Sequence, residues 1–439
     1  MITKVQSTGL TTRSNALSLL EKILQENKSL EEAFAECTEF AFLEQRDKAF
    51  VRFLIGSTLR RLGQIDYLLN HFLKRPLPQR DKQTRNILRM GITQIIFMKT
   101  PPHAVVNTSV NLCQKTGNSG KKGLVNALLR RVLLEGQNSF SKQDSAFLNT
   151  PNWMWKTWKE AYGQSNCREI ATTHLTQPAL DLTVKSDPEF WAKKLNAQIL
   201  PTGSLRIVHN GKIQNLKGFN EGAWWVQDTA ASIPARVLIA SLQKYKNPKI
   251  LDLCAAPGGK TAQLATSQNG VIAVDRSKSR TKLLQENMKR LNLTVKIITS
   301  DIKNYKPNNP VDGILLDAPC TATGTIRRHP DVLHNRKPED VRRLAEIQLE
   351  LLKTATELLK TGAILIYSVC TLQPEEGPDV IQKLLALQNK LKRVPIDPLK
   401  FGLPQSAQTQ TGDLRTLPFH LGKHGGMDGF FISRLKLAS

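Results

Sequence analysis

The stretch Asp252-Leu253-Cys254-Ala255-Ala256-Pro257-Gly258-Gly259-Lys260-Thr261 decides the fold of the C-terminal half of this 439-residue chain. It joins a short apolar strand to a helix, and its paired glycines let a ligand approach the backbone closely. A Walker A loop ending at Thr261 would need glycine at position 254, where Cys254 stands, and GxGxxG does not fit either. We therefore expect residues 254–260 to form a ligand-binding loop of another class.

Around this loop, short apolar segments alternate with helical ones from about residue 236 onward. This alternation predicts a mostly parallel sheet covered by helices on both faces. Ligands of such sheets bind at the carboxyl ends of the strands, so we expect the functional residues there. The predicted strands are 250–253, 271–274, 295–298, 313–316 and 363–367, and helices are predicted at 279–291 and 341–359.

An acidic residue follows each of the next three predicted strands: Asp275, Asp301 and Asp317. Asp275 comes sixteen residues after Gly259, where an acid can accept hydrogen bonds from both ribose hydroxyls of a nucleoside. Acids at strand ends can also be helix caps, so alone they decide little. Facing one glycine loop, however, they predict a cationic nucleoside cofactor such as S-adenosylmethionine.

Two cysteines, Cys320 and Cys370, follow the fourth and fifth predicted strands. A single Cys in an apolar stretch is usually a small buried side chain, but two at neighbouring strand ends indicate a site. A thiolate added to carbon-6 of a pyrimidine makes carbon-5 nucleophilic enough to attack an activated methyl group. An acid such as Asp317 could then stabilise the charge on the base. The sequence thus predicts methyl transfer to a pyrimidine.

The first 146 residues differ in texture, with apolar residues at helical spacing and a concentrated positive charge. The whole chain carries a formal charge of +25, and residues 60–131 hold 14 Lys and Arg against two acids. For one cation a solvated surface is the simpler explanation, but this surplus favours phosphate binding. We expect a helical RNA-binding domain whose contacts include Lys121, Lys122, Arg130 and Arg131.

Between these regions, residues 147–235 combine a tryptophan-rich helical segment with short alternating runs. Trp155 and Trp158 share a helix face, which indicates packing rather than base stacking. The alternating runs predict a small α+β module. We therefore divide the chain into a helical domain at 1–146, a linker and module at 147–235, and an α/β domain at 236–439.

Composition excludes several classes of protein. The six cysteines include no CxxC pair, which argues against a disulfide scaffold and a short-spaced zinc site and fits a reducing cytosol. No apolar run approaches the roughly 18–20 residues that span a bilayer, and the first fifteen residues lack the apolar core of a signal peptide. We expect a cytoplasmic protein, without a metal or membrane partner, that acts as a monomer.

Three motifs resemble the signatures of RNA cytosine-5 methyltransferases, and more narrowly of their bacterial Sun/Fmu group. They are DLCAAPGGKT at 252–261, LLDAPCTATGTIRRHPD at 315–331 and YSVCTLQPEE at 367–376. The segments HAVVNTSVNL and GLVNALLRR resemble a NusB-like RNA-binding domain, and GGMDGFFISRLK resembles the family's closing strand. The resemblance covers nearly the whole chain. It implies an all-α NusB-like domain, a small module and a Rossmann-like domain that methylates small-subunit (16S) ribosomal RNA with S-adenosylmethionine.

The resemblance also implies roles for individual residues. Cys370 matches the nucleophile that adds to carbon-6, and Cys320 matches the second cysteine, which serves in product release. Asp317 matches an acid lying between base and cofactor. The remaining matches are Cys254, Ala255, Ala256, Pro257, Gly258, Gly259 and Lys260 in the cofactor loop, Asp275 and Asp301 on the ribose and adenine sides, and Arg327, Arg328 and His329 near the RNA.

Departures from the family pattern leave these groups in place. Val369 stands where Thr usually precedes the nucleophile, Ser300 stands where Gly is common, and NEGAWWVQD at 220–228 is bulkier than usual. A DNA methyltransferase would use Cys320 and need no Cys370, and an amino-group methyltransferase would carry [DN]PP[FY] instead of DAPC. A non-catalytic RNA-binding or antitermination factor, or an enzyme acting on another RNA, remains as an alternative.

Overall fold

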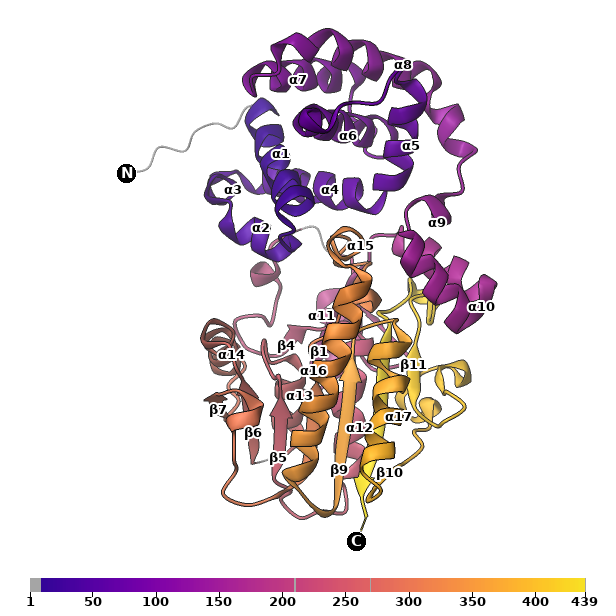
Figure 1. The fold of residues 1–439 in the computed structure, drawn as a ribbon. Coiled ribbons are helices and arrows are strands. Elements are labelled where there is room, and N and C mark those ends of the chain that lie inside the picture. Colours follow the sequence, from indigo (N-terminus) through magenta and orange to yellow (C-terminus); the bar gives the residue numbers. More distant parts are fainter. Residues whose placement is uncertain (1–8, 209–210, 269, 439) are drawn as a thin grey trace. The chain divides into compact units, whose positions relative to one another are not determined.

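The computed structural model describes residues 9–208, 211–268 and 270–438, and its chain forms two compact units (Figure 1). The helical unit comprises residues up to 176 together with Arg328–Arg336. The sheet unit comprises Gln177–Arg327 and Lys337–Ser439. This division differs from the three predicted segments, because the tryptophan-rich helix belongs to the helical unit and the small module packs with the large sheet.

The helical unit is built from amphipathic helices around one apolar core, as the spacing of its apolar residues predicts. Leu20, Ile23, Leu128 and Val132 are all buried in this core. Its helices are α1 (Gly9–Glu26), α2 (Leu30–Glu36), α3 (Thr38–Phe42), α4 (Gln45–Arg60), α5 (Leu62–Phe72), α6 (Lys82–Ile96), α7 (Pro102–Lys115), α8 (Lys122–Ser141), α9 (Ser145–Leu148), α10 (Asn152–His174) and α15 (Val332–Asn335).

Helix α10 carries the predicted tryptophan face, and both tryptophans are packed. Trp158 is fully buried against the ring of His174, at 5.4 Å between centroids, and Trp155 is buried against Phe147. The helix is interrupted at Gly163, whose φ is +82°. The preference for packing over base stacking is confirmed.

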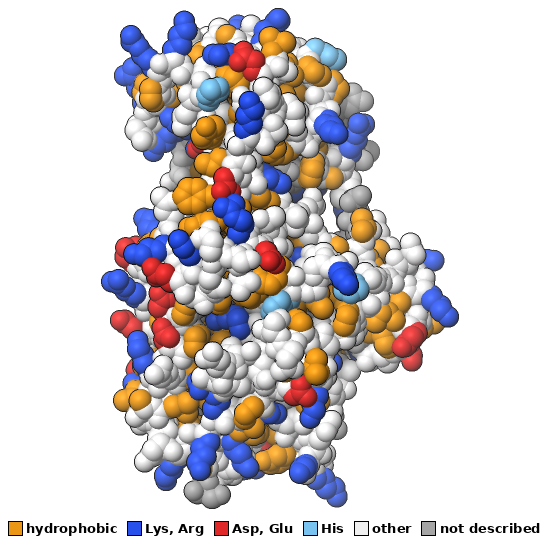
Figure 2. Space-filling view, turned by 90° about the vertical axis from the view of Figure 1, so that its right-hand side faces the viewer, with side chains coloured by type: hydrophobic (Ala, Val, Ile, Leu, Met, Phe, Trp, Pro, Cys, Tyr) orange, Lys and Arg blue, Asp and Glu red, His pale blue; other side chains and the backbone are white. Residues whose placement is uncertain are grey.

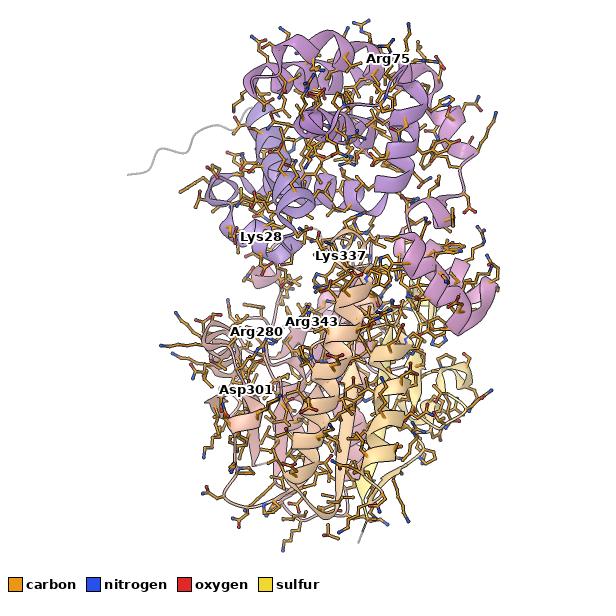
Figure 3. The ribbon with its side chains drawn as sticks, viewed as in Figure 1. Lys28, Arg75, Arg280, Asp301, Lys337 and Arg343 are labelled. Atoms are coloured by element: carbon orange, nitrogen blue, oxygen red, sulfur yellow. The ribbon has the colours of Figure 1, made fainter. Side chains whose placement is uncertain are left out.

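The segment 328–336, which contains α15, lies within the helical unit although it follows the fourth predicted strand in sequence. The Asp331 carboxylate accepts a hydrogen bond from the Leu30 N–H, the first residue of α2, at 3.1 Å. Asn335 Nδ2 donates to the Lys28 carbonyl at 2.7 Å, and Lys28 is marked in Figure 3. The start of α2 is thus held by residues about 300 positions further along the chain.

The sheet unit begins with a small antiparallel sheet in the order β2-β3-β1-β4. Trp224 is fully buried and packs with Trp191 and Leu182 in the core of this module, which accounts for the bulk of the 220–228 segment. The elements are β1 (Leu180–Val184), α11 (Pro188–Leu195), β2 (Gln198–Ile199), β3 (Leu205–Ile207) and β4 (Trp224–Val226).

Among the described residues, eight strands form the large sheet, in the order β10-β12-β9-β8-β5-β6-β7 with β11 pairing β12. The five strands from β9 to β7 are parallel, as predicted, and β12 closes the sheet antiparallel to β9. The strands are β5 (Ile250–Leu253), β6 (Val271–Asp275), β7 (Lys296–Thr299), β8 (Val311–Asp317), β9 (Leu359–Val369), β10 (Leu391–Arg393), β11 (Leu414–Thr416) and β12 (Phe430–Leu437).

Alternating side chains of these strands fill two separate cores on opposite faces of the sheet. Leu365 and Tyr367 of β9 pack with α16 (Pro338–Glu357) and α17 (Pro378–Leu387), whereas Ile364 and Ile366 pack with α12 (Ile233–Ser241). Helices α13 (Gly259–Ser267) and α14 (Lys278–Arg290) follow β5 and β6 (Figure 1). From β5 the next strands, β6 and β7, lie on one side in the sheet, whereas from β8 the next strand, β9, lies on the other side. A ligand is expected where the strand order reverses in this way, at the carboxyl ends of β5 and β8.

Candidate active site

The glycine loop connects β5 to α13 through backbone conformations that favour glycine. Gly258 has φ +106°, and a Cβ placed there would lie 2.3 Å from Leu284 Cδ1. Cys254 also has positive φ, +59°. The absence of a side chain at Gly258 therefore lets the loop pack tightly against α14 at the mouth of the sheet.

Asp275 ends β6 and fastens this loop. Its carboxylate, 2% exposed, accepts hydrogen bonds from the backbone N–H groups of Ala256 at 3.2 Å and Ser277 at 3.0 Å. Arg280 Nη2 lies 3.5 Å from the same carboxylate, and its guanidinium also donates to the Ala256 carbonyl. The predicted ribose-side acid is thus held at the predicted place, beside the loop.

Asp301 follows β7 but is more exposed. Its carboxylate accepts a hydrogen bond from the Lys303 N–H at 2.9 Å and caps the short turn that follows. Asp301 and Arg280 are both marked in the region of β7 and α14 in Figure 3. The capping role weighed in the sequence therefore applies to this acid, and its side chain remains open to solvent.

Asp252, inside β5, is a fully buried carboxyl. One of its oxygens accepts a hydrogen bond from Thr261 Oγ1 at 2.5 Å, and the other, Oδ1, has no hydrogen-bond partner among the described residues. Burial raises the pKa of Asp252 to about 7. A buried acceptor without a partner, just beneath the glycine loop, is suited to a ligand group that donates a hydrogen bond.

Asp317, at the end of β8, connects the glycine loop to the neighbouring strand β9. One of its oxygens accepts a hydrogen bond from Lys260 Nζ at 2.7 Å and the other accepts one from Ser368 Oγ at 2.9 Å. Its side chain is 32% exposed, so it also faces the open end of the sheet. The predicted base-contacting acid therefore lies next to the cofactor loop.

The two predicted cysteines come together. Cys320 Sγ lies 3.4 Å from Cys370 Sγ, and the Gly324 N–H, in the loop after Cys320, donates to the Cys370 carbonyl at 3.0 Å. The hydrogen bond to Cys370 raises the pKa of Cys320 well above its usual value, and burial acts in the same direction. Cys320 therefore remains a protonated thiol near neutral pH, beside the sulfur of Cys370. Burial also raises the pKa of Cys254, in the glycine loop, to about 12.

Glu376, which our sequence analysis did not single out, lies fully buried behind the two cysteine loops. Its carboxylate accepts hydrogen bonds from Thr321 and Thr371, the residues that follow Cys320 and Cys370. The sequence does show this residue as the second acid of the QPEE segment after Cys370. Nothing in a local pattern distinguishes this buried acid from Glu375 beside it.

The four cations predicted to bind RNA divide into two pairs in the helical unit. Lys121 pairs with Asp81 at 2.8 Å and Arg131 with Glu135 at 3.2 Å. Lys122 and Arg130 instead line a groove of about 620 Å³ between α7 and α8. His103, Asn107 and Asn126 contribute polar side chains to the same groove, and Lys and Arg are spread over the visible face of this unit (Figure 2).

Arg327, for which the resemblance predicts a place near the RNA, is buried inside the sheet unit. Its guanidinium is 1% exposed, donates to the Gly425 carbonyl at 2.6 Å, and lies 3.4 Å from Asp228 and 3.7 Å from Asp428. These partners come from distant parts of the chain, so the sequence alone did not show that Arg327 is buried. Its role is to join the loops of the sheet unit.

Arg328 and His329 lie in the helical unit and are half-buried. Burial lowers the pKa of His329 to about 4, and the positive charge of Arg328 acts in the same direction. His329 is therefore a neutral imidazole near neutral pH, which leaves it without the positive charge that attracts phosphate.

Two further classes of site were sought in the described part of the chain. There, no group of three or more His, Cys, Asp or Glu side chains is arranged to hold a metal ion. Within the same residues, no helix combines the length and apolarity that a membrane crossing requires.

Two family models and several curated relatives match this chain. Residues 239–436 match the model of the 16S rRNA methyltransferase RsmB/F family, and residues 10–134 match that of the NusB family. The chain is 30% identical to ribosomal RNA small subunit methyltransferase B of Klebsiella pneumoniae, with 96% of this chain and 97% of the relative covered. It is 32% identical to the protein of that name from Shewanella oneidensis, with 97% and 99% covered.

The fold has a counterpart among solved structures over almost its whole length. The crystal structure of PH0851 covers 98% of this chain and 99% of its own, with a TM-score of 0.73 and 21% identity. At that identity the likeness concerns the fold, whereas the near-complete match to the two bacterial relatives concerns the family. This chain belongs to the RsmB/F family of 16S rRNA methyltransferases.

Proposed function

We propose that the protein transfers a methyl group from S-adenosylmethionine to carbon-5 of a cytosine in 16S rRNA, through a covalent bond between Cys370 and carbon-6. The observation that carries the proposal is the pair of thiols 3.4 Å apart beside the Asp317–Lys260 ion pair. A cytosine-5 methyltransferase of this kind needs a nucleophile, a second sulfur and a base-contacting acid at one place.

The residues around the glycine loop suit the cofactor. The backbone of the tightly packed loop at Gly258, the anchored carboxylate of Asp275 and the unpartnered oxygen of Asp252 would hold its nucleoside and amino acid parts. When bound, S-adenosylmethionine supplies an electrophilic methyl group. Lys260, held by Asp317, keeps the loop in contact with the base-binding side of the site.

The reaction uses the two cysteines in turn. The Cys370 thiolate forms a bond to carbon-6, and the electron pair displaced to carbon-5 takes up the methyl group. Asp317 would stabilise the charge on the base during this addition by hydrogen bonding at the ring nitrogen and amino group. Once Cys370 is bonded to carbon-6, Cys320 no longer faces a thiolate and releases its own proton to solvent. As a thiolate it then accepts the carbon-5 proton, the electrons of that C–H bond form the carbon-5–carbon-6 double bond, and the Cys370–carbon-6 bond breaks with its electrons returning to Cys370.

RNA binding falls to the helical unit in this proposal. Lys122 and Arg130 in the α7–α8 groove would contact phosphates, whereas Lys121 and Arg131 hold other side chains of the unit. The target cytosine must leave its stack to reach Cys370, so we expect it in a loop or another accessible strand.

The decisive experiment measures methyl transfer from labelled S-adenosylmethionine to protein-free 16S rRNA, followed by nucleoside analysis. We expect label in 5-methylcytosine with the wild type and none with Cys370→Ala. Cys320→Ala should instead accumulate a covalent RNA adduct that survives a denaturing gel. Label in another nucleoside would overturn the carbon-5 assignment, and label with Cys370→Ala would move the nucleophile to Cys320.

A further inference from the structure

A buried carboxylate joins the two cysteine loops. Glu376 is fully buried and ends the turn Pro374–Glu376 after β9. Its Oε1 accepts hydrogen bonds from the Thr321 N–H at 2.8 Å and from Gln348 Nε2 at 3.1 Å. Its Oε2 accepts from Thr371 Oγ1 at 2.7 Å and from the Thr321 hydroxyl. Oε2 thus joins the loops after β8 and β9, and Oε1 joins the loop after β8 to α16.

Each loop threonine lies directly after a cysteine, so the carboxylate acts close to both sulfurs. Thr321 follows Cys320 and Thr371 follows Cys370, and their hydroxyls are themselves 3.0 Å apart. Because Glu376 fixes both, a change in its position would change the separation of the two sulfur atoms. Burying a charged carboxylate is costly, and a fold that needed only to fill this space would do so with an apolar residue.

The surroundings of Glu376 keep it in one position. Gln348 from α16 also donates to the Pro319 carbonyl at 2.9 Å, immediately before Cys320. The Tyr367 hydroxyl donates to the Glu376 carbonyl at 2.7 Å. Helix α16 therefore holds the carboxylate of Glu376, and strand β9 holds its backbone carbonyl.

We propose that Glu376 is a positioning residue for the proposed reaction, which fixes Cys320 against Cys370 and supports the release of the methylated product. It touches neither substrate nor cofactor in this role. The inference rests on the proposed covalent mechanism and extends it by assigning the group that holds the two sulfurs in register.

Glu376 affects Cys320 through its negative charge as well as through the position that it gives to the cysteine loop. Cys320 faces Cys370 at the end of β9 and Glu376 in the following turn, and both raise the pKa of Cys320. Tyr367 interacts electrostatically with Cys320 and Glu376, which raise its pKa, and with Arg415 from β11, which lowers it. After Cys370 has bonded to carbon-6, the carboxylate of Glu376 still makes Cys320 a stronger base for the carbon-5 proton.

The experiment compares Glu376→Gln, Thr321→Val and Thr371→Val with the wild type on 16S rRNA, in steady-state reactions for KM and kcat and in single-turnover reactions for the separate steps. Glu350→Gln, an exposed acid on α16 paired with Lys353, is the matched control. Three quantities are measured: the rate of covalent adduct formation, the rate of its conversion to 5-methylcytosine, and the pH dependence of that conversion. Thermal melting of each variant reports its folding.

With Glu376→Gln we expect an unchanged KM for RNA, a kcat lower by about 10- to 100-fold, and accumulation of the adduct. The midpoint of adduct conversion should move to lower pH, because removing the negative charge lowers the pKa of Cys320. Thr321→Val should slow mainly adduct conversion, and Thr371→Val should slow mainly adduct formation. A structural role alone would lower the melting temperature without moving the pH midpoint.

Wild-type rates for both steps with a wild-type pH midpoint in Glu376→Gln would overturn the inference. If Glu376→Gln fails to fold, Thr321→Val and Thr371→Val, which are nearly isosteric with the wild type, test the inference instead. Equal effects of these two variants on adduct formation and on adduct conversion would also overturn it. Failure of the wild type to form 5-methylcytosine would instead count against the proposed function, so the two failures are distinguishable.

Discussion

At Gly258 a single missing side chain controls the cofactor loop. Gly258→Ala should weaken binding of S-adenosylmethionine and methyl transfer, because the new Cβ would meet Leu284 and the positive φ costs an L-residue about 1–2 kcal/mol. Calorimetric titration with S-adenosylmethionine and thermal melting would measure this. Gly422→Ala, where a Cβ has open space and φ is not positive, should change neither. Wild-type affinity in Gly258→Ala would contradict the packing argument.

Asp252 makes the stability of the protein depend on pH. Its folded-state pKa of about 7 lies above the ordinary value of 3.8, so the folded state binds the proton more tightly. The resulting stability is complete below about pH 4 and is lost as pH rises through about 7. We expect the melting temperature of Asp252→Asn, relative to that of the wild type, to rise between pH 5 and pH 8. A difference independent of pH would show that Asp252 is ionised throughout.

Single residues also show which parts of the site can be predicted from the sequence. Cys320, Cys370 and Asp317 could be located because each directly follows an apolar strand, and parallel strands bring their carboxyl ends together. Glu376 and Arg327 could not, because their burial depends on partners from distant segments. A charged residue in a loop is exposed by default, and only the folded structure shows which ones are enclosed.

At the scale of elements, the α7–α8 groove separates two kinds of cation. The double variant Lys122→Ala with Arg130→Ala should bind 16S rRNA more weakly. The slope of log Kd against log salt concentration should also fall in magnitude by about 1.4, because each single-strand phosphate that is no longer neutralised accounts for about 0.7. The exposed doublet Lys74→Ala with Arg75→Ala removes the same charge elsewhere in the unit. Binding isotherms at several salt concentrations provide the comparison. An equal reduction of slope in both doubles would show that the footprint is not the groove.

Helices and strands are more predictable than their ends. Strand β5 is predicted over its observed residues, but β9 extends from Leu359 to Val369, beyond the predicted 363–367. Pairing extends the strand beyond the predicted residues at both ends: Leu359 pairs with Val311 of β8, and Ser368 and Val369 pair with β12. Tertiary pairing, rather than propensity, sets these boundaries.

At the scale of the whole molecule, the order of the sequence does not match the division into units. The segment 328–336 belongs to the helical unit, where Asp331 accepts the hydrogen bond from the N–H that begins α2. Asp331→Ala should lower the stability of this unit by about 1 kcal/mol, a typical cost for removing a cap. Thermal melting would measure this, with Glu339→Ala, an exposed acid in the first turn of α16, as a comparison. An unchanged melting temperature with Asp331→Ala would mean that water replaces the carboxylate.

The placement of this segment has a consequence for synthesis of the protein. A ribosome makes residues 1–176 first, but the hydrogen bonds from Asp331 and Asn335 that complete the helical unit are not made until nearly 160 residues later. By then β5, β6, β7 and β8 have already been translated. The unit whose synthesis begins first is therefore not completed first in one stretch: its final assembly waits until the second unit is partly built.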